Sequence, residues 1–279
     1  MSHAPPAIPS FFTAADRPLF CVYHAPGPDR PDAPIVLHAH STGFEQLTSC
    51  LAEAGFARAA ADAGFPALRY HARGHGDSTG DFADVTLDSL VEDALAAAAE
   101  ARARSGRSRI VWLGVRFGAL VAAEAIRRGA PADALALWEP AIDPDRFYRA
   151  MLRGVLFFHV SEGRRPAFTV DQMMEAVERD GRVDVLGYYL HRALVRSTRG
   201  VNLETLLGGW SGPTLIAQVQ ARPRLTEAHA ALARSLEARG ASVSTAVIRE
   251  EPGWQIFSNP AWVGTDLARR TVEWLDALA

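Results

Sequence analysis

Residues 112–120 read Trp112-Leu113-Gly114-Val115-Arg116-Phe117-Gly118-Ala119-Leu120, the form of a nucleophile elbow in which arginine replaces the nucleophile. In such an elbow a strand, here predicted at residues 109–113, ends in a tight turn that leads into a helix and presents one side chain at the edge of the sheet. A guanidinium stays protonated and has no acceptor lone pair, so it cannot attack a carbonyl. Its planar fork can bind a carboxylate or a phosphate instead. The stretch therefore predicts a catalytic scaffold without its usual nucleophile.

Apolar strand-like runs alternate with longer Ala-rich amphipathic stretches along most of the 279-residue chain. This alternation is typical of an α/β protein with a mostly parallel sheet and helices on both faces. We expect strands at residues 19–24, 35–40, 67–71, 109–113, 134–138, 214–219 and 244–248. We expect helices between them at residues 48–63, 86–105, 119–128, 227–239 and 264–279.

The alternation fails once, between Glu139 and Gly212, where the chain turns helical without a clear strand. Helices are predicted there at residues 147–159, 170–178 and 185–195. An insertion of this length in a doubly wound fold is expected to cover the carboxyl ends of the strands, where ligands bind. We therefore predict an α/β core made of residues 1–139 and 212–279, with a helical cap at residues 140–211.

Two further turns each follow a predicted strand. The first, His38-Ala39-His40-Ser41-Thr42-Gly43, lies where α/β hydrolases place the loop that donates an oxyanion-hole N–H. The second, Arg73-Gly74-His75-Gly76-Asp77-Ser78-Thr79-Gly80, resembles the RGxGxS turn of the same proteins. In this order, and each after a strand, the two turns and the elbow predict the α/β-hydrolase fold.

More narrowly, the chain resembles the hydrolase-like proteins that are encoded with exosortase A systems. The resemblance covers most of residues 11–200 and rests on Phe20-Cys21-Val22-Tyr23-His24-Ala25-Pro26, Gly76-Asp77-Ser78-Thr79-Gly80-Asp81-Phe82, Trp112-Leu113-Gly114-Val115-Arg116 and Gly187-Tyr188. It implies that arginine at the elbow is a trait of that group. The chain departs from the group at His40-Ser41-Thr42, where the group tends to follow its histidine with Pro-Phe and acidic residues. Substrate and pathway are therefore not carried over.

The other two positions of a catalytic triad also lack their usual residues. The acid of an α/β hydrolase usually follows the strand predicted at residues 214–219, where this chain has Gln220-Ala221-Arg222-Pro223-Arg224. The histidine usually follows the last strand, where this chain has Glu250-Glu251-Pro252-Gly253-Trp254-Gln255. Because all three positions are changed together, the sequence argues against Ser-His-Asp acyl transfer.

Side chains at the carboxyl ends of the strands supply the candidates for other chemistry. As catalytic residues we predict His40 as proton carrier, Arg116 as anchor for an anionic group, and Glu139, which ends the strand after the elbow helix. The predicted substrate-binding residues are His38, Ser41, His71, Phe117, Tyr148, Tyr188 and Trp254. Structural interpretations stay open. His40 can brace loop backbone, and Arg116 can be a buried cation that pairs with Glu139 or Glu250.

Composition limits the classes of partner and cofactor that we expect this protein to bind. A formal net charge of -3 gives no sign of nucleic-acid or membrane-surface binding, and no apolar run is long enough to span a bilayer. Cys21 and Cys50 are too few for a disulfide framework, and nothing indicates a metal site or a bound cofactor. We expect a cytoplasmic protein whose partner is a small, anionic substrate, and a homodimer stays open.

Two functions fit these observations. The first is an enzyme that acts on a small carboxylated or acyl-bearing metabolite by histidine- and arginine-assisted proton transfer, as a lyase, isomerase or cyclase, or by water-mediated hydrolysis. The second is a catalytically inactive pseudo-hydrolase that keeps the fold to bind a small ligand or a protein partner. The intact glycines around the elbow favour the enzyme.

Overall fold

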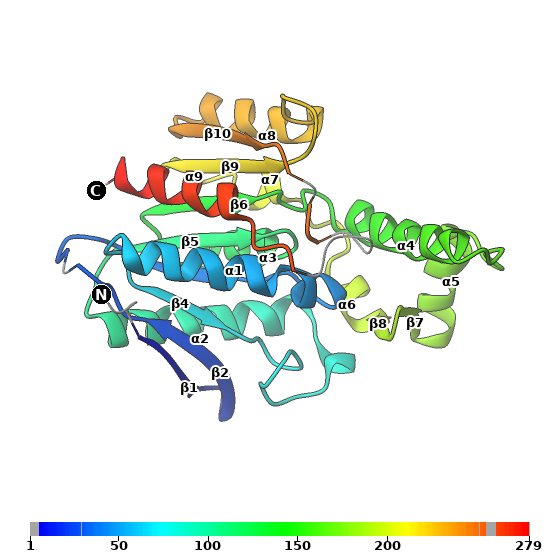
Figure 1. Ribbon diagram of the computed structural model, residues 1–279. Helices are drawn as coiled ribbons and strands as arrows, with labels where there is room; N and C mark the ends of the chain where they lie inside the picture. The colour runs from blue at the N-terminus through cyan, green and yellow to red at the C-terminus, as the bar shows by residue number, and fades with distance from the viewer. Residues whose placement is uncertain (1–5, 29, 251, 255–260, 279) are drawn as a thin grey trace.

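An eight-stranded sheet forms the centre of the computed structural model, which describes residues 6–28, 30–250, 252–254 and 261–278 (Figure 1). The strand order is β1-β2-β4-β3-β5-β6-β9-β10, and β2 runs antiparallel to both of its neighbours, whereas the other neighbours pair in parallel. The strands are β1 (Ala7–Ala14), β2 (Arg17–His24), β3 (Ile35–Ala39), β4 (Ala67–Tyr70), β5 (Ile110–Val115), β6 (Ala134–Trp138), β9 (Thr214–Val219) and β10 (Val243–Ile248). This sheet is that of the α/β-hydrolase fold, so the predicted fold class is confirmed.

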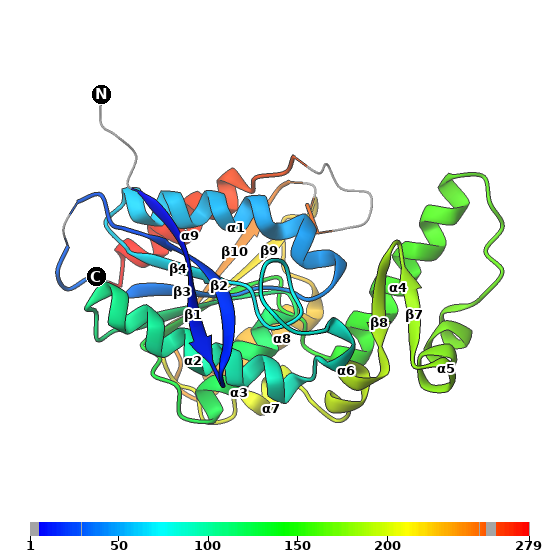
Figure 2. The ribbon, with the colours of Figure 1, turned by 90° about the horizontal axis from the view of Figure 1, so that it is seen from below.

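Two layers of helices enclose the sheet, because its central strands are apolar on both faces (Figure 2). One face carries α1 (Phe44–Asp62) and α9 (Thr265–Asp276). The other face carries α2 (Leu87–Ser105), α3 (Gly118–Arg127) and α8 (Glu227–Ala238). Each face of the sheet packs into its own hydrophobic core. Consecutive residues of a strand point to opposite faces, so Val36 packs toward α1 and Leu37 toward α2. No helix in the described part of the chain has the length and apolar character needed to cross a bilayer.

The chain between β6 and β9 forms an insertion that extends beyond the end of the sheet (Figure 2). It consists of α4 (Pro144–Ser161), α5 (Val170–Asp180), the hairpin β7 (Arg182–Val185) and β8 (Tyr188–His191), α6 (Arg192–Ser197) and α7 (Leu203–Leu206). The helix predicted at residues 185–195 is wrong over residues 185–191, and only residues 192–195 are helical, as part of α6. Leu186 and Gly187 have φ angles of 54° and 91°, and two consecutive positive φ angles turn the chain into a tight hairpin instead of a helix.

Two further differences from the sequence prediction concern the edge of the sheet and the start of α1. Strand β1 was not predicted. Residues 1–10 are rich in proline and alanine, but an edge strand tolerates proline such as Pro9. Helix α1 begins at Phe44, four residues before the predicted start. This earlier start places Glu45 in the first turn of the helix, directly behind the loop that follows β3.

Candidate functional site

The elbow is a tight strand-to-helix turn centred on Arg116. Arg116 has a φ of 54°, and its backbone N–H donates to the carbonyl of Trp138 at 3.0 Å. A Cβ on Gly114 would lie 2.6 Å from the Cα of Ala119, and one on Gly118 would lie 1.9 Å from the carbonyl oxygen of Ala39. Both contacts are too close for any side chain, so the turn requires glycine at both positions.

The Arg116 guanidinium binds two carboxylates. Its Nε donates to Glu45 Oε2 at 3.1 Å and its Nη2 to Glu45 Oε1 at 2.9 Å, a bidentate pair. Its Nη1 donates to the carbonyl of Glu139 at 3.3 Å and lies 3.6 Å from Glu139 Oε1. The side chains of Arg116 and Glu139 are each 16% exposed and that of Glu45 is 8% exposed. The predicted catalytic pair, Arg116 and Glu139, is therefore in contact, within a cluster of one cation and two carboxylates.

Glu45 is the residue of this cluster that the sequence reasoning missed. It also accepts a hydrogen bond from the buried Ser41 hydroxyl at 2.9 Å, four residues earlier in the chain. Glu250, one of the two partners considered for Arg116, instead accepts from Trp262 Nε1 at 2.8 Å and from the backbone N–H of Asp266 at 3.2 Å. Glu251 and Gln255 lie outside the described residues.

Glu139 occupies an unusual position at the end of β6. Its φ is 40°, its backbone N–H donates to the carbonyl of Ala217 at 2.7 Å, and its Oε2 accepts from the backbone N–H of Val219 at 3.3 Å. Burial raises the pKa of the Glu139 carboxyl to about 7, although the nearby Arg116 acts to lower it. Glu139 therefore exchanges its proton close to neutral pH.

Aromatic rings cover the guanidinium of Arg116. Its Cζ lies 5.5 Å from the ring centroid of Phe147 on α4 and 5.8 Å from that of Trp254, which follows β10. Phe117 is fully buried and stacks at 5.5 Å on Phe147. Of the predicted substrate-binding residues, Ser41, Phe117 and Trp254 thus lie around Arg116. Tyr148 is buried in the core, with its hydroxyl 3.1 Å from that of Thr198.

His40 joins two backbone segments. Its Nδ1 lies 2.5 Å from the carbonyl oxygen of Ser41, which can only accept, so Nδ1 carries the proton. Its Nε2 accepts from the backbone N–H of Ala72 at 3.0 Å. Burial lowers the pKa of the His40 imidazole, which keeps it neutral. Both ring nitrogens are thus engaged, and this geometry supports the bracing role for His40 that the sequence left open.

The remaining two histidines of the prediction lie away from Arg116. His38 is buried under α1, where its ring stacks on Phe56 at 5.4 Å and its Nδ1 lies 3.9 Å from Glu53 Oε2. Within the described chain, neither ring nitrogen of His38 has a hydrogen-bond partner. His71 is partly exposed and lines a separate cleft together with Tyr188, the last predicted substrate-binding residue.

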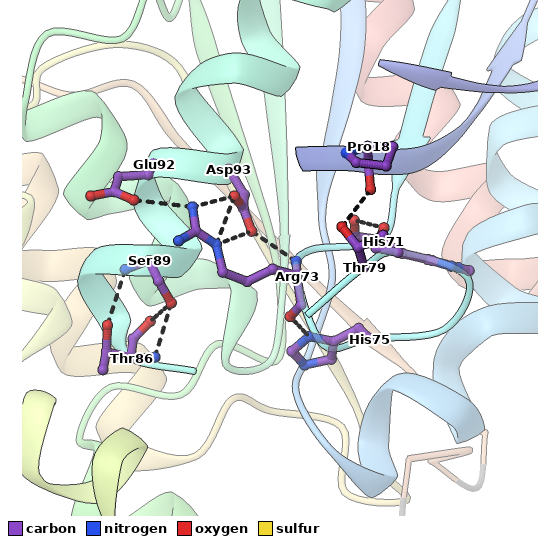
Figure 3. A network of polar contacts seen from close by, with 10 residues as sticks. Pro18, His71, Arg73, His75, Thr79, Thr86, Ser89, Glu92 and Asp93 are labelled. Atoms are coloured by element: carbon purple, nitrogen blue, oxygen red, sulfur yellow. Dashed lines mark hydrogen bonds and ion pairs between the residues drawn. The ribbon is translucent and has the colours of Figure 1, made fainter. Parts of the chain in front are cut away.

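The turn at residues 73–80 is fixed to α2 by a buried ion pair (Figure 3). Arg73 Nη2 donates to Asp93 Oδ1 at 2.7 Å, and the backbone N–H of Arg73 donates to Asp93 Oδ2 at 2.8 Å. His75 Nδ1 in turn donates to the Arg73 carbonyl at 3.0 Å. These contacts hold the end of β4 in place and give the turn a structural role. Among the described residues, no three His, Cys, Asp or Glu side chains are arranged to hold a metal ion.

Comparison with known proteins supports the fold. The serine aminopeptidase family S33 matches residues 37–166. The esterase Est1E from Butyrivibrio proteoclasticus, in a structure with bound ferulic acid, is 18% identical over 96% of this chain and 97% of its own, with a TM-score of 0.68. A putative hydrolase from Agrobacterium vitis is 19% identical over 97% and 99%, with a TM-score of 0.62. The Pyrococcus furiosus esterase PF2001 is 15% identical over 98% and 91%, with a TM-score of 0.65. A search of curated sequences gives no match.

Proposed function

We propose that this protein is an enzyme of the α/β-hydrolase fold that transfers a proton through Glu139, beside the fixed positive charge of Arg116, without an acyl-serine intermediate. One observation carries the proposal. Arg116 and Glu139 directly follow the adjacent strands β5 and β6, both have positive φ angles, of 54° and 40°, and their side chains touch. Such strained residues cost about 1–3 kcal/mol each and cluster at functional sites.

The arrangement suits general acid–base catalysis. A carboxyl whose pKa is about 7 can both accept and release a proton near neutral pH. Arg116 stabilises the carboxylate form of Glu139, and the amino-terminal end of α3 directly follows the elbow, where its dipole stabilises developing negative charge. Removal of a proton next to a carbonyl group, or from a water that attacks one, fits these parts.

Glu139 replaces His40 as the proton carrier in this proposal, because both nitrogens of His40 are bound to backbone. The charge balance also bears on the substrate. Glu45 and ionised Glu139 carry two negative charges, whereas Arg116 carries one positive charge. The cluster then has a net negative charge, which would repel a further carboxylate. An uncharged acyl-bearing substrate therefore suits the site better than a carboxylated one. The esterases among the structural neighbours support an acyl-bearing substrate, and the preference for an uncharged one rests on the charges of the cluster alone.

A second candidate is a binding protein without catalysis. The observation that favours it is the bidentate pair between Arg116 and Glu45. This pair occupies Nε and Nη2 of the guanidinium, at the position where a hydrolase presents its nucleophile. In this case the strained elbow only completes the fold.

Solvent deuterium exchange separates the two candidates without knowledge of the net reaction. Small ketones, esters and thioesters are incubated with the protein in deuterium oxide, and loss of the hydrogen next to the carbonyl is followed by proton NMR. We expect exchange with at least one compound, lowered by about 10²–10⁴ in Glu139→Gln, the range for a general acid or base. Glu273→Gln, an exposed change on α9, is the matched control.

Exchange that is unaffected in Glu139→Gln would overturn the assignment of Glu139. Binding of the same compounds with neither exchange nor hydrolysis of the esters and thioesters, both followed by the same NMR spectra, would favour the binding protein. Melting temperatures of both variants, measured alongside, ensure that the proteins compared are folded.

A further inference from the structure

A cleft lies between the hairpin of the insertion and the core, and none of the residues of the Arg116 cluster lines it. Its volume is about 500 Å³, which is large enough for a small molecule. Three segments meet there: the first turns of α1, the loop from His71 to the short 3-10 helix η1 (Phe82–Asp84), and the hairpin β7–β8. Gly43 and Gln46 line this cleft, whereas Glu45 of the same segment binds Arg116, so the segment separates the two sites.

Aromatic side chains form much of the wall of the cleft. Tyr188 and Tyr189 on the hairpin line the cleft, and their exposed fractions are 37% and 38%. Each tyrosine therefore leaves more than a third of its surface accessible to a ligand. Across from them is Phe82, whose ring packs edge-on at 5.7 Å against His191. The rings are held in place: Tyr188 meets Phe44 at 6.0 Å and Arg182 lies 4.2 Å over the ring of Tyr189.

The polar groups of the cleft are uncharged or balanced. His71 Nδ1 accepts from the backbone N–H of Asp77 at 3.2 Å, so its Nε2 carries the proton. Burial lowers the pKa of His71 to about 4, and the ring is neutral at pH 7. The charge of Arg182 is matched by Asp81, which also lines the cleft. The cleft thus offers aromatic surface and a neutral N–H donor, with no surplus of either charge.

Glycines set the floor of this cleft. A Cβ on Gly76, whose φ is 50°, would lie 2.2 Å from Nδ1 of His71. A Cβ on Gly74 would lie 2.8 Å from the backbone of Phe82. Only glycine lets the loop approach the His71 side chain and the Phe82 backbone so closely, and this approach holds both residues at the cleft.

We propose that this cleft binds an uncharged planar aromatic molecule that carries a hydroxyl or carbonyl oxygen. The ring packs against Tyr188, Tyr189 and Phe82, and the oxygen accepts from the Nε2–H of His71. Aromatic pairs contribute beyond the burial of apolar area, and a neutral donor recognises an oxygen without requiring a charge. The proposal does not depend on catalysis by Glu139, because the cleft shares no side chain with the Arg116 cluster.

Ligand-observed NMR and isothermal titration calorimetry with 2-naphthol test the proposal, with cyclohexanol as the non-aromatic comparison. We expect 2-naphthol to bind and cyclohexanol to bind at least tenfold more weakly. Tyr189→Ala should weaken 2-naphthol binding at least tenfold, and Tyr188→Ala likewise. Phe11→Ala, which removes a 55% exposed ring from β1, is the matched control and should leave binding unchanged.

Glu139→Gln distinguishes this site from the one under the proposed function. It should leave 2-naphthol binding unchanged, and loss of binding in that variant would place the ligand at the Arg116 cluster and overturn the proposal. Equal binding of the two alcohols, no binding of 2-naphthol, or full binding in both tyrosine variants would also overturn it.

Discussion

Arg116 and Glu45 form a bidentate ion pair in which Nε and Nη2 of the guanidinium donate to the two carboxylate oxygens at 3.1 and 2.9 Å. The pair joins the elbow after β5 to the first turn of α1, the helix that follows the loop at residues 38–43. Taking both charges out of water is costly, and only their close geometry offsets that cost. Removal of either partner leaves a buried charge without its bidentate partner.

Glu45→Gln should therefore lower the free energy of unfolding by about 3 kcal/mol, the lower end of the range for a broken buried pair, because Glu139 remains beside Arg116. Urea denaturation measures the effect. Glu273→Gln, which removes exposed pairs with Arg269 and Arg270, should change the free energy of unfolding by less than about 1 kcal/mol. Equal effects of the two variants would show that the Arg116–Glu45 pair is not a structural element.

The position of Glu45 also shows why the site was predicted only in part. The contact between Arg116 and Glu139 follows from strand order, because β5 and β6 are neighbours and each of the two residues directly follows its strand. Glu45 could not be placed in this way. Its position depends on the start of α1 at Phe44, and the apolar spacing of the sequence indicates a start at Thr48. Ser41 and Glu45, four residues apart, were the available signal.

The fold was more predictable than the site, because buried parallel strands are continuous apolar runs that sequence reading recognises well. Strands β6 and β9 were predicted with the bounds that the structure has. The hairpin β7–β8 was predicted as a helix, since Val185, Leu186, Tyr189 and Leu190 also suit a helical spacing. The positive φ angles of Leu186 and Gly187 determine that the chain forms a hairpin there, and apolar periodicity does not predict φ angles.

A serine at the elbow should not restore esterase activity. The last histidine of the chain is His229 on α8, whose Nε2 donates to the carbonyl of Pro140 at 3.1 Å, so a new hydroxyl would lack a histidine base. Without Arg116, which acts to lower the pKa of Glu139, burial keeps the Glu139 carboxyl protonated, so it does not replace the histidine. We expect the double variant Arg116→Ser/Glu45→Gln, which removes both charges of the pair, to hydrolyse 4-nitrophenyl acetate no faster than the wild type.

A fluorophosphonate probe supplies the complementary measurement on the wild-type protein. Ser41 is buried and donates to Glu45, and Ser78 donates to the carbonyl of His71 at 2.6 Å, so neither hydroxyl is activated. Mass spectrometry should detect no adduct. A labelled Ser41 or Ser78 would contradict the proposal that the protein acts without a serine nucleophile.

Glu139 should make the protein less stable as the pH rises from about 5 to 8. Its pKa is about 7 in the folded protein, above the usual value of 4.5, so the folded state binds the proton more tightly than the unfolded state. The stabilisation is complete below pH 4.5 and is lost as the pH passes through 7, with a magnitude on the order of 3 kcal/mol. Urea denaturation at several pH values, compared between wild type and Glu139→Gln, isolates this contribution. An unchanged difference between the two proteins across this range would contradict it.

His40→Ala should destabilise the protein through the backbone that His40 joins. The Nδ1–H donates to the carbonyl of Ser41 and Nε2 accepts from the N–H of Ala72, so the imidazole ties the loop after β3 to the residues after β4. Its loss leaves the Ala72 N–H buried without a partner, which costs about 1–3 kcal/mol. Thermal and urea denaturation measure this change, and His159→Ala on α4, whose ring is only partly buried, is the matched control. A melting temperature equal to that of the wild type, together with a large loss of deuterium exchange, would instead assign proton transfer to His40 and remove the bracing role.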